Sequence, residues 1–116
     1  MRTVIFGSRD FTNTALLNKA LDQLHEVYKF SLVIDGVARG VDTLAHNWAV
    51  RNCIPTAREP AQWNKYGKAA GPIRNELMIT KYHPELAIAF PGGNGTRHMT
   101  GLCHEYGLLV KTVRPR

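Results

Sequence analysis

Short apolar runs alternate with longer amphipathic stretches along the whole chain. We expect the apolar runs to form strands, because runs of roughly four to eight apolar residues bounded by glycine or proline are typical of buried strands in parallel sheets. The stretches between them are long enough to hold helices. The expected strands lie within residues 3–7, 31–36, 55–60, 85–93 and 108–115.

The segments between the expected strands carry apolar residues at helical spacing. In the first segment, Leu17, Leu21 and Leu24 form one stripe, and polar residues take the opposite side. Thr12 is the expected N-cap of this helix, and Gly107 is expected to end the last helix. The expected helices run from Thr12 to Tyr28 and over residues 41–53, 73–82 and 95–107.

Strands and helices alternate along residues 1–116 in the order β-α-β-α-β-α-β-α-β, with no linker or repeat. This order predicts the α/β class: a single domain with a Rossmann-like, doubly wound parallel sheet of about five strands and helices on both faces. The polar, glycine-bearing residues 60–72 are expected to form a loop over the sheet edge. In such sheets the ligand crevice lies outside the carboxyl ends of the strands, where the glycine-bearing turns of this chain fall.

The composition is that of a soluble globular protein, with 44% hydrophobic and 21% charged residues in a chain of 116. No apolar run approaches the roughly 20 residues needed to cross a bilayer, and the N-terminus lacks the pattern of a signal peptide. We therefore expect a cytoplasmic protein with no membrane partner. Its five histidines are scattered without metal-ligand spacing, so we expect no bound metal and no cofactor.

The formal net charge of +6 is compatible with two kinds of partner, nucleic acid or an anionic small molecule. The chain has no run of basic residues. Arg9, Arg39, Arg74 and Arg97 instead lie inside or beside the glycine-bearing turns. This placement favours a pocket for an anionic small molecule over an extended nucleic-acid surface.

The segment PGGNGT at 91–96 is the most specific chemical signal, because it follows an apolar strand and precedes a helix. Gly92, Gly93 and Gly95 let backbone amides approach an anion. Thr96 adds a hydroxyl at the start of a helix, whose first amides and dipole attract phosphate. The segment is neither a Walker motif nor the GxGxxG of a dinucleotide fold. The alternative is a tight turn in which the glycines are needed for positive φ.

Two further turns carry candidate binding residues. GSRD at 7–10 offers Ser8 and Arg9 to a phosphate or a base edge, although Ser and Asp also serve as ordinary helix caps. In DGVARGVD at 35–42, Asp42 is placed either to accept a hydrogen bond from a ribose hydroxyl or to cap its own helix.

A fourth turn, GPIRNE at 71–76, places Arg74 where it can reach a phosphate or a developing anion. Glu76 is either an acid–base group or a solvated carboxylate, and its two-residue spacing from Arg74 points it to a different side. The candidate catalytic residues are Arg74, Glu76 and Asp42. The expected ligand-binding residues are Gly7, Ser8, Arg9, Gly36, Arg39, Gly40, Asp42, Arg74, Asn75, Pro91, Gly92, Gly93, Asn94, Gly95 and Thr96.

Taken together, these turns resemble the SLOG superfamily, which joins the Smf/DprA DNA-processing proteins and the LOG phosphoribohydrolases, and the chain looks like its small YspA-like branch. The resemblance covers nearly the whole chain and implies a Rossmann-like fold that binds nucleotides or nucleotide-derived molecules, often as a dimer or larger oligomer. It is carried by FGSRDF at 6–11, DGVARGVDTLAHNWA at 35–49, WNKYGKAAGPIRNE at 63–76 and AFPGGNGTRHM at 89–99.

The chain departs from the LOG pattern at two positions. LOG hydrolases carry PGGxGTxxE, and the position of that glutamate is held here by Met99, whose thioether cannot transfer protons. Loss of a general acid–base group costs about 10²–10⁴-fold in rate. The related form of the DGVARG turn has a second glycine where this chain has Val37. Arg74 matches the arginine of the second LOG motif.

Three functions follow from these observations. The first is binding of a nucleotide or a phosphoribosyl- or ADP-ribose-like compound, as a sensor or sequestering protein in a bacterial or phage setting. The second is hydrolysis of an N-glycosidic bond in nucleoside monophosphates, for which Asp10, Asp42 or Glu76 has to replace the missing glutamate. The third, by analogy with the Smf/DprA branch, is binding of single-stranded DNA. Met99 favours the first.

Overall fold

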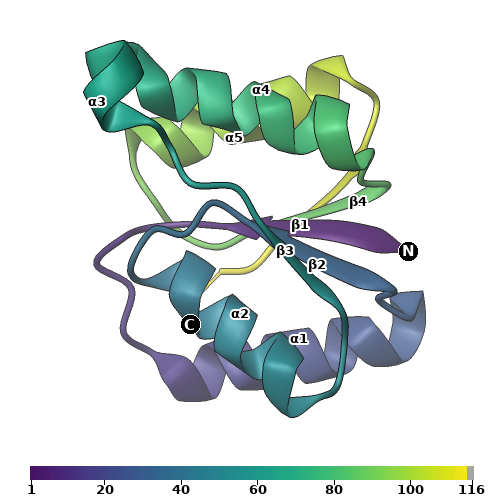
Figure 1. The fold of residues 1–116 in the computed structure, drawn as a ribbon. Coiled ribbons are helices and arrows are strands. Elements are labelled where there is room, and N and C mark those ends of the chain that lie inside the picture. The colour runs from purple at the N-terminus through teal and green to yellow at the C-terminus, as the bar shows by residue number, and fades with distance from the viewer. Residues whose placement is uncertain (115–116) are drawn as a thin grey trace.

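A parallel sheet of five strands forms the centre of the computed structural model, which describes residues 1–114 (Figure 1). The strand order is β3-β2-β1-β4-β5, and every neighbouring pair is parallel. Along the chain, β1 forms the centre of the sheet, β2 and β3 are added on one side of it, and β4 and β5 are then added on the other side. The strands are β1 (Arg2–Phe6), β2 (Leu32–Asp35), β3 (Thr56–Arg58), β4 (Leu86–Ala89) and β5 (Leu109–Thr112).

Helices cover both faces of the sheet. Figure 1 shows α1 and α2 on one face and α4 and α5 on the other, with the short α3 at the end of the molecule where α4 and α5 begin. The predicted α/β doubly wound fold is therefore confirmed. The helices are α1 (Thr14–Tyr28), α2 (Val41–Arg51), α3 (Trp63–Tyr66), α4 (Ala70–Tyr82) and α5 (Asn94–Glu105), with a 3-10 turn, η1 (Gly67–Ala69), before α4.

The central strands are buried on both faces because successive side chains point to opposite sides of the sheet. Ile5 and Val33 pack into the cluster beneath α1 and α2. Val4 and Ile34 pack into the second cluster, beneath α4 and α5. All four side chains are fully buried, as the continuous apolar runs predicted.

Two expectations for the local structure are wrong. The N-cap of α1 is Asn13, whose side chain accepts a hydrogen bond from the Leu16 amide at 3.1 Å, and not Thr12. The expected loop at 60–72 contains α3, η1 and the start of α4. Pro72 does not interrupt α4, because it lies in the first turn, where a backbone N–H has no helical partner to lose.

The last two strands of the structure are shorter than the strands that the sequence predicts. The strand expected over 85–93 ends at Ala89, and the last strand, β5, ends at Thr112. Pro115, which the last expected strand included, lies outside the described residues. Within residues 1–114, no helix is both long and apolar enough to cross a membrane.

Candidate functional site

The strand order reverses between β1 and β4, so a topological switch point lies at the carboxyl ends of these two strands. The chain leaves β1 toward α1 on one face and leaves β4 toward α5 on the other, so the two turns diverge above neighbouring strands. Ser8, in the turn after β1, donates its amide to Pro91 O at 2.8 Å and accepts from the Val41 amide at 3.2 Å. Three of the four predicted turns therefore meet at Ser8.

Close backbone contacts explain several of the glycines in these turns. A Cβ added at Gly7 would lie 2.7 Å from Val41 Cγ2, and one at Gly40 would lie 2.2 Å from Ser8 O. A Cβ added at Gly92 would lie 2.0 Å from the hydroxyl oxygen of Thr96. These glycines are needed to bring the turns together, a reason that the sequence did not indicate.

Gly93 and Gly95 are different, because a Cβ added at either would meet nothing within 4 Å. Among residues 1–114 the glycines with positive φ are Gly40, Gly67 and Gly107, so the tight-turn alternative for PGGNGT is wrong. Packing within the described protein therefore requires glycine at neither 93 nor 95. The space beside them is open.

The start of α5 lies at this open space. Its N-cap is Gly93, which makes no side-chain capping hydrogen bond, whereas α1 is capped by the Asn13 side chain. Arg97 donates its amide to Gly93 O, while the three amides before it belong to the first turn, where a helix has no internal acceptors. The uncapped first turn presents N–H groups and the positive end of the helix dipole to this open space.

Asp42 holds the turn after β2 in shape. Its side chain is 5% exposed, and Oδ2 accepts hydrogen bonds from the amides of Gly36 at 3.1 Å and Ala38 at 3.2 Å. Burial raises the pKa of Asp42 from its ordinary value of 3.8 to about 6, and the two backbone hydrogen bonds act against this rise. The carboxylate thus organises the backbone of the neighbouring turn.

Val37 keeps a conformation that glycine usually adopts. Its φ is 66°, in the left-handed region, which is strained for a β-branched side chain. The Val37 amide donates to Asp35 Oδ1 at 2.8 Å, and the amides of the residues on either side, Gly36 and Ala38, donate to the Asp42 carboxylate. The position where the related motif has glycine is therefore glycine-like in its backbone but carries a valine.

Arg74 reaches from α4 to the turn after β2. Its Nη1 donates to Gly36 O, and its Nε donates to Asn75 Oδ1 at 3.1 Å. Burial lowers the pKa of Arg74, the nearby Asp42 carboxylate opposes this effect, and the charge of Arg9 adds to it. The structure therefore brings Arg74 to three predicted residues of the other turns: it contacts Gly36 and lies near Asp42 and Arg9. Gly36 leaves room for the guanidinium, since a Cβ added there would lie 2.5 Å from Nη1.

Other predicted residues lie farther from this group. Glu76 is exposed on α4 and accepts a hydrogen bond at 3.0 Å from the hydroxyl of Tyr106, which follows the C-terminal end of α5. Its side chain therefore points toward the C-terminal end of α5 and not toward the start of that helix. Arg39 forms an ion pair with Asp10 at 3.1 Å, but these side chains are 77% and 84% exposed, so solvent screens the pair.

Asn75 and His98 form a contact that sequence reasoning missed in part. Asn75 is 6% exposed and lies between α4 and α5, where its Nδ2 is 3.2 Å from Nδ1 of His98. Asn75 was predicted as a binding residue, but His98 was treated as one of several scattered histidines. No sequence motif links the two positions, because their contact depends on how two helices pack.

A buried ionic cluster at the ends of β2 and β3 was also missed. Asp35 is fully buried, and Arg58 Nε donates to both of its carboxylate oxygens at 3.1 Å. His46 Nδ1 lies 3.7 Å from Asp35 Oδ2. The aspartate at the end of an apolar run was a visible signal, but Arg58 lies on a strand of three residues whose sequence gave none.

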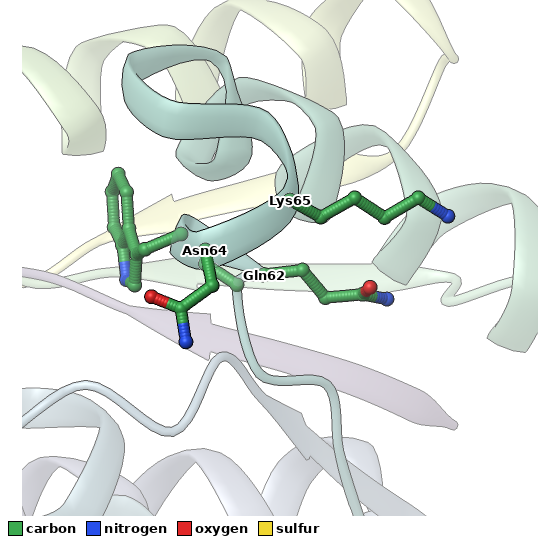
Figure 2. Close-up of a pocket in the computed structure, with 5 residues that line it drawn as sticks. Gln62, Asn64 and Lys65 are labelled. Carbon is green, nitrogen blue, oxygen red and sulfur yellow. The ribbon is translucent and has the colours of Figure 1, made fainter.

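The short helix α3 borders a pocket of about 390 Å³ at the end of the molecule where α5 begins (Figure 2). Figure 2 shows Gln62 and Lys65 extending to one side of α3, while Asn64 points a different way. Trp63 is 54% exposed and Tyr66 39% exposed, so neither ring is buried against the sheet. Exposed rings of this kind can stack on a base. The pocket is lined by Ala61, Gln62, Trp63, Asn64 and Lys65.

The described part of the chain contains no group of three or more His, Cys, Asp or Glu side chains that could hold a metal ion. The groups that the candidate site offers to a ligand are arginine side chains and backbone amides, both of which are hydrogen-bond donors. Such a donor set suits phosphate.

Comparison with known proteins relates this chain to a sequence family, a phage protein and a solved structure. A sequence model of the YspA, cpYpsA-related SLOG family matches residues 1–66. The Gene 61 protein of Mycobacterium phage D29 is 35% identical over 118 aligned positions, which cover 94% of this chain and 93% of that protein. The X-ray structure of DNA processing protein A (DprA) from Streptococcus pneumoniae matches with a TM-score of 0.78 at 18% identity, over 99% of this chain and 50% of that one. The chain thus shares the DprA fold and spans about half the length of that protein.

Proposed function

This chain belongs to the YspA, cpYpsA-related SLOG family, and we propose that it binds a nucleotide or a nucleotide-derived small molecule at the carboxyl edge of its sheet. One observation carries the proposal. Gly93 and Gly95 lie beside open space at the uncapped start of α5, although no packing contact within the protein requires glycine at either position. A phosphate that binds the first amides of α5 would occupy the open space beside Gly93 and Gly95, which explains why neither position carries a side chain.

Positive charge near the start of α5 supports an anionic ligand. Arg74 carries its guanidinium to the neighbouring turn after β2, and the charge of Arg9 is close enough to affect the pKa of Arg74. We propose that these two arginines supply charge to the phosphate group. The exposed ring of Trp63 on α3 offers a surface for the base.

Binding without turnover is favoured over hydrolysis by the surroundings of the carboxylates. Met99, at the position of the LOG glutamate, is 1% exposed and packs in the apolar cluster beneath α4 and α5. Asp42 is occupied by backbone amides, Asp10 pairs with Arg39 in solvent, and Glu76 pairs with Tyr106. We therefore propose a sensor or sequestering role, as a homodimer or larger oligomer.

The proposal is tested by titrating the protein with AMP, ADP-ribose and ribose 5-phosphate, using calorimetry and thermal shift. Gly95→Val should weaken AMP binding at least about tenfold, a loss of about 1.4 kcal/mol, because the side chain fills the open space beside the first turn. Gly101→Val is the matched control, since Gly101 is also on α5 and also has no neighbour within 4 Å of an added Cβ. The two substitutions should change the stability of α5 by similar amounts, because both replace a helical glycine that has no packing neighbours.

Absence of any nucleotide-induced change in the melting temperature of the wild-type protein would contradict the proposal. Equal AMP affinities for Gly95→Val and Gly101→Val would show that the ligand binds elsewhere. Chromatography of AMP after incubation tests the alternative, since base release that Arg74→Ala abolishes would establish hydrolysis. Salt-dependent binding of oligonucleotides, without binding of nucleotides, would instead support a single-stranded DNA function.

A further inference from the structure

A chain of hydrogen bonds from Gly36 through Arg74 and Asn75 to His98 fixes the position of one proton. The Nε of Arg74 can only donate, so the Asn75 atom that faces it at 3.1 Å must be the carbonyl oxygen, Oδ1. The other end of the Asn75 amide, Nδ2, therefore faces His98. The guanidinium thus decides the orientation of the asparagine.

The orientation of Asn75 in turn decides the tautomer of His98. An amide nitrogen can only donate, so Nδ1 of His98, which lies 3.2 Å from Asn75 Nδ2, must accept. A nitrogen that accepts a hydrogen bond carries no proton. The proton of the neutral ring is therefore on Nε2, which becomes a donor.

The position of His98 on α5 brings this donor to the candidate phosphate site. His98 follows Asn94, the first residue of α5, by one helical turn, so the two side chains share a face. Helical side chains lean toward the N-terminus of their helix, which places the ring over the first turn. His98 is exposed, whereas the asparagine that holds it is 6% exposed.

We propose that His98 is a ligand-binding residue that donates a hydrogen bond from Nε2 to a phosphate oxygen of the bound nucleotide, and that Asn75 is its positioning residue. This inference rests on the proposed function, because it assigns a further contact to the same site. It also explains why both ends of the buried Asn75 amide form hydrogen bonds with side chains, Arg74 at one end and His98 at the other. The simpler alternative is that Asn75 and His98 only hold α4 against α5.

The first test needs no ligand. NMR spectra of the wild-type protein are recorded at a pH at which the His98 ring is neutral. The ring ¹⁵N chemical shifts should then show a proton on Nε2 and none on Nδ1. Asn75→Asp replaces the amide donor by a carboxylate acceptor and should move a proton onto Nδ1. A wild-type ring protonated on Nδ1 would overturn the assignment, since Asn75 could then not donate to it.

The second test measures affinity by calorimetry with AMP and ribose 5-phosphate. His98→Leu should weaken both ligands about ten- to hundredfold, as expected for a lost hydrogen bond to a charged group. His98→Gln, whose amide can place a donor near the position of Nε2, should recover part of the loss. His104→Leu, at an exposed histidine near the other end of α5, is the control and should leave both affinities unchanged.

The outcomes separate this inference from the proposed function. If wild-type protein binds neither ligand, the proposed function fails. If wild-type protein binds both and His98→Leu binds them equally well, only the role of His98 fails and Asn75 serves helix packing alone. A loss restricted to AMP would place the contact at the base and would overturn the phosphate assignment.

Discussion

Because Val37 has a left-handed backbone, the difference in stability between its glycine and alanine variants should have the opposite sign to that at an ordinary helical position. A residue with a Cβ pays about 1–2 kcal/mol for the left-handed conformation, whereas glycine adopts it freely. Val37→Gly should therefore be more stable than Val37→Ala by about 1 kcal/mol. The comparison of glycine with alanine leaves out the methyl groups of valine, which lose similar contacts in both variants.

Val27 provides the matched control, because it is 70% exposed on α1. There Val27→Gly should be less stable than Val27→Ala by about 1 kcal/mol, the usual cost of glycine inside a helix. Urea unfolding of the four variants gives the free energies of unfolding, and a difference of 1 kcal/mol corresponds to roughly 4 °C in melting temperature for a domain of this size. If Val37→Ala is at least as stable as Val37→Gly, as alanine should be at position 27, Val37 does not adopt the left-handed conformation in the native protein, and the reasoning is refuted.

Two further predictions concern single side chains. Asp42 keeps its proton to about pH 6 in the folded protein, against an ordinary pKa of 3.8, so its contribution to the free energy of unfolding is greatest below pH 3.8 and is lost as the pH rises through 6. Asp42→Asn should remove that part of the pH dependence in urea titrations from pH 4 to 7, while Asp35, whose pKa burial also raises, still contributes; an unchanged pH profile would contradict the burial of this charge. Asn13→Ala should cost about 1 kcal/mol by removing the α1 cap, and Thr12→Ala should cost much less, so equal losses in thermal unfolding would return the cap to Thr12.

The fold could be predicted from the sequence because the three central strands, β1, β2 and β4, are apolar runs that end near glycine-bearing turns. Where that reasoning failed, tertiary context decided the outcome. Pro72 looked like a loop residue, but the first turn of α4 has no hydrogen bond for proline to break. Gly92 is also required by packing, because a Cβ there would lie 2.0 Å from the hydroxyl oxygen of Thr96; its predicted role in ligand binding stays a prediction.

The candidate site could be predicted only as a set of turns. PGGNGT and GSRD are legible because glycine and helix-start residues form local patterns. The contact between Asn75 and His98 joins two helices and leaves no pattern along the chain. The same holds for Asp35 and Arg58, whose pairing follows from strand register.

The central position of β1 also has a consequence for synthesis of the protein on the ribosome. β1 is made first and pairs early with β2, but its other neighbour, β4, begins only at Leu86. Until then one edge of a fully buried, apolar strand remains open, and such edges are prone to pair with other chains. The hydrogen bond from Ser8 to Pro91 cannot form before β4 arrives. The nascent chain therefore passes through a stage that is most open to aggregation or chaperone binding, and the sheet edge that carries the candidate site is completed only when that stage ends.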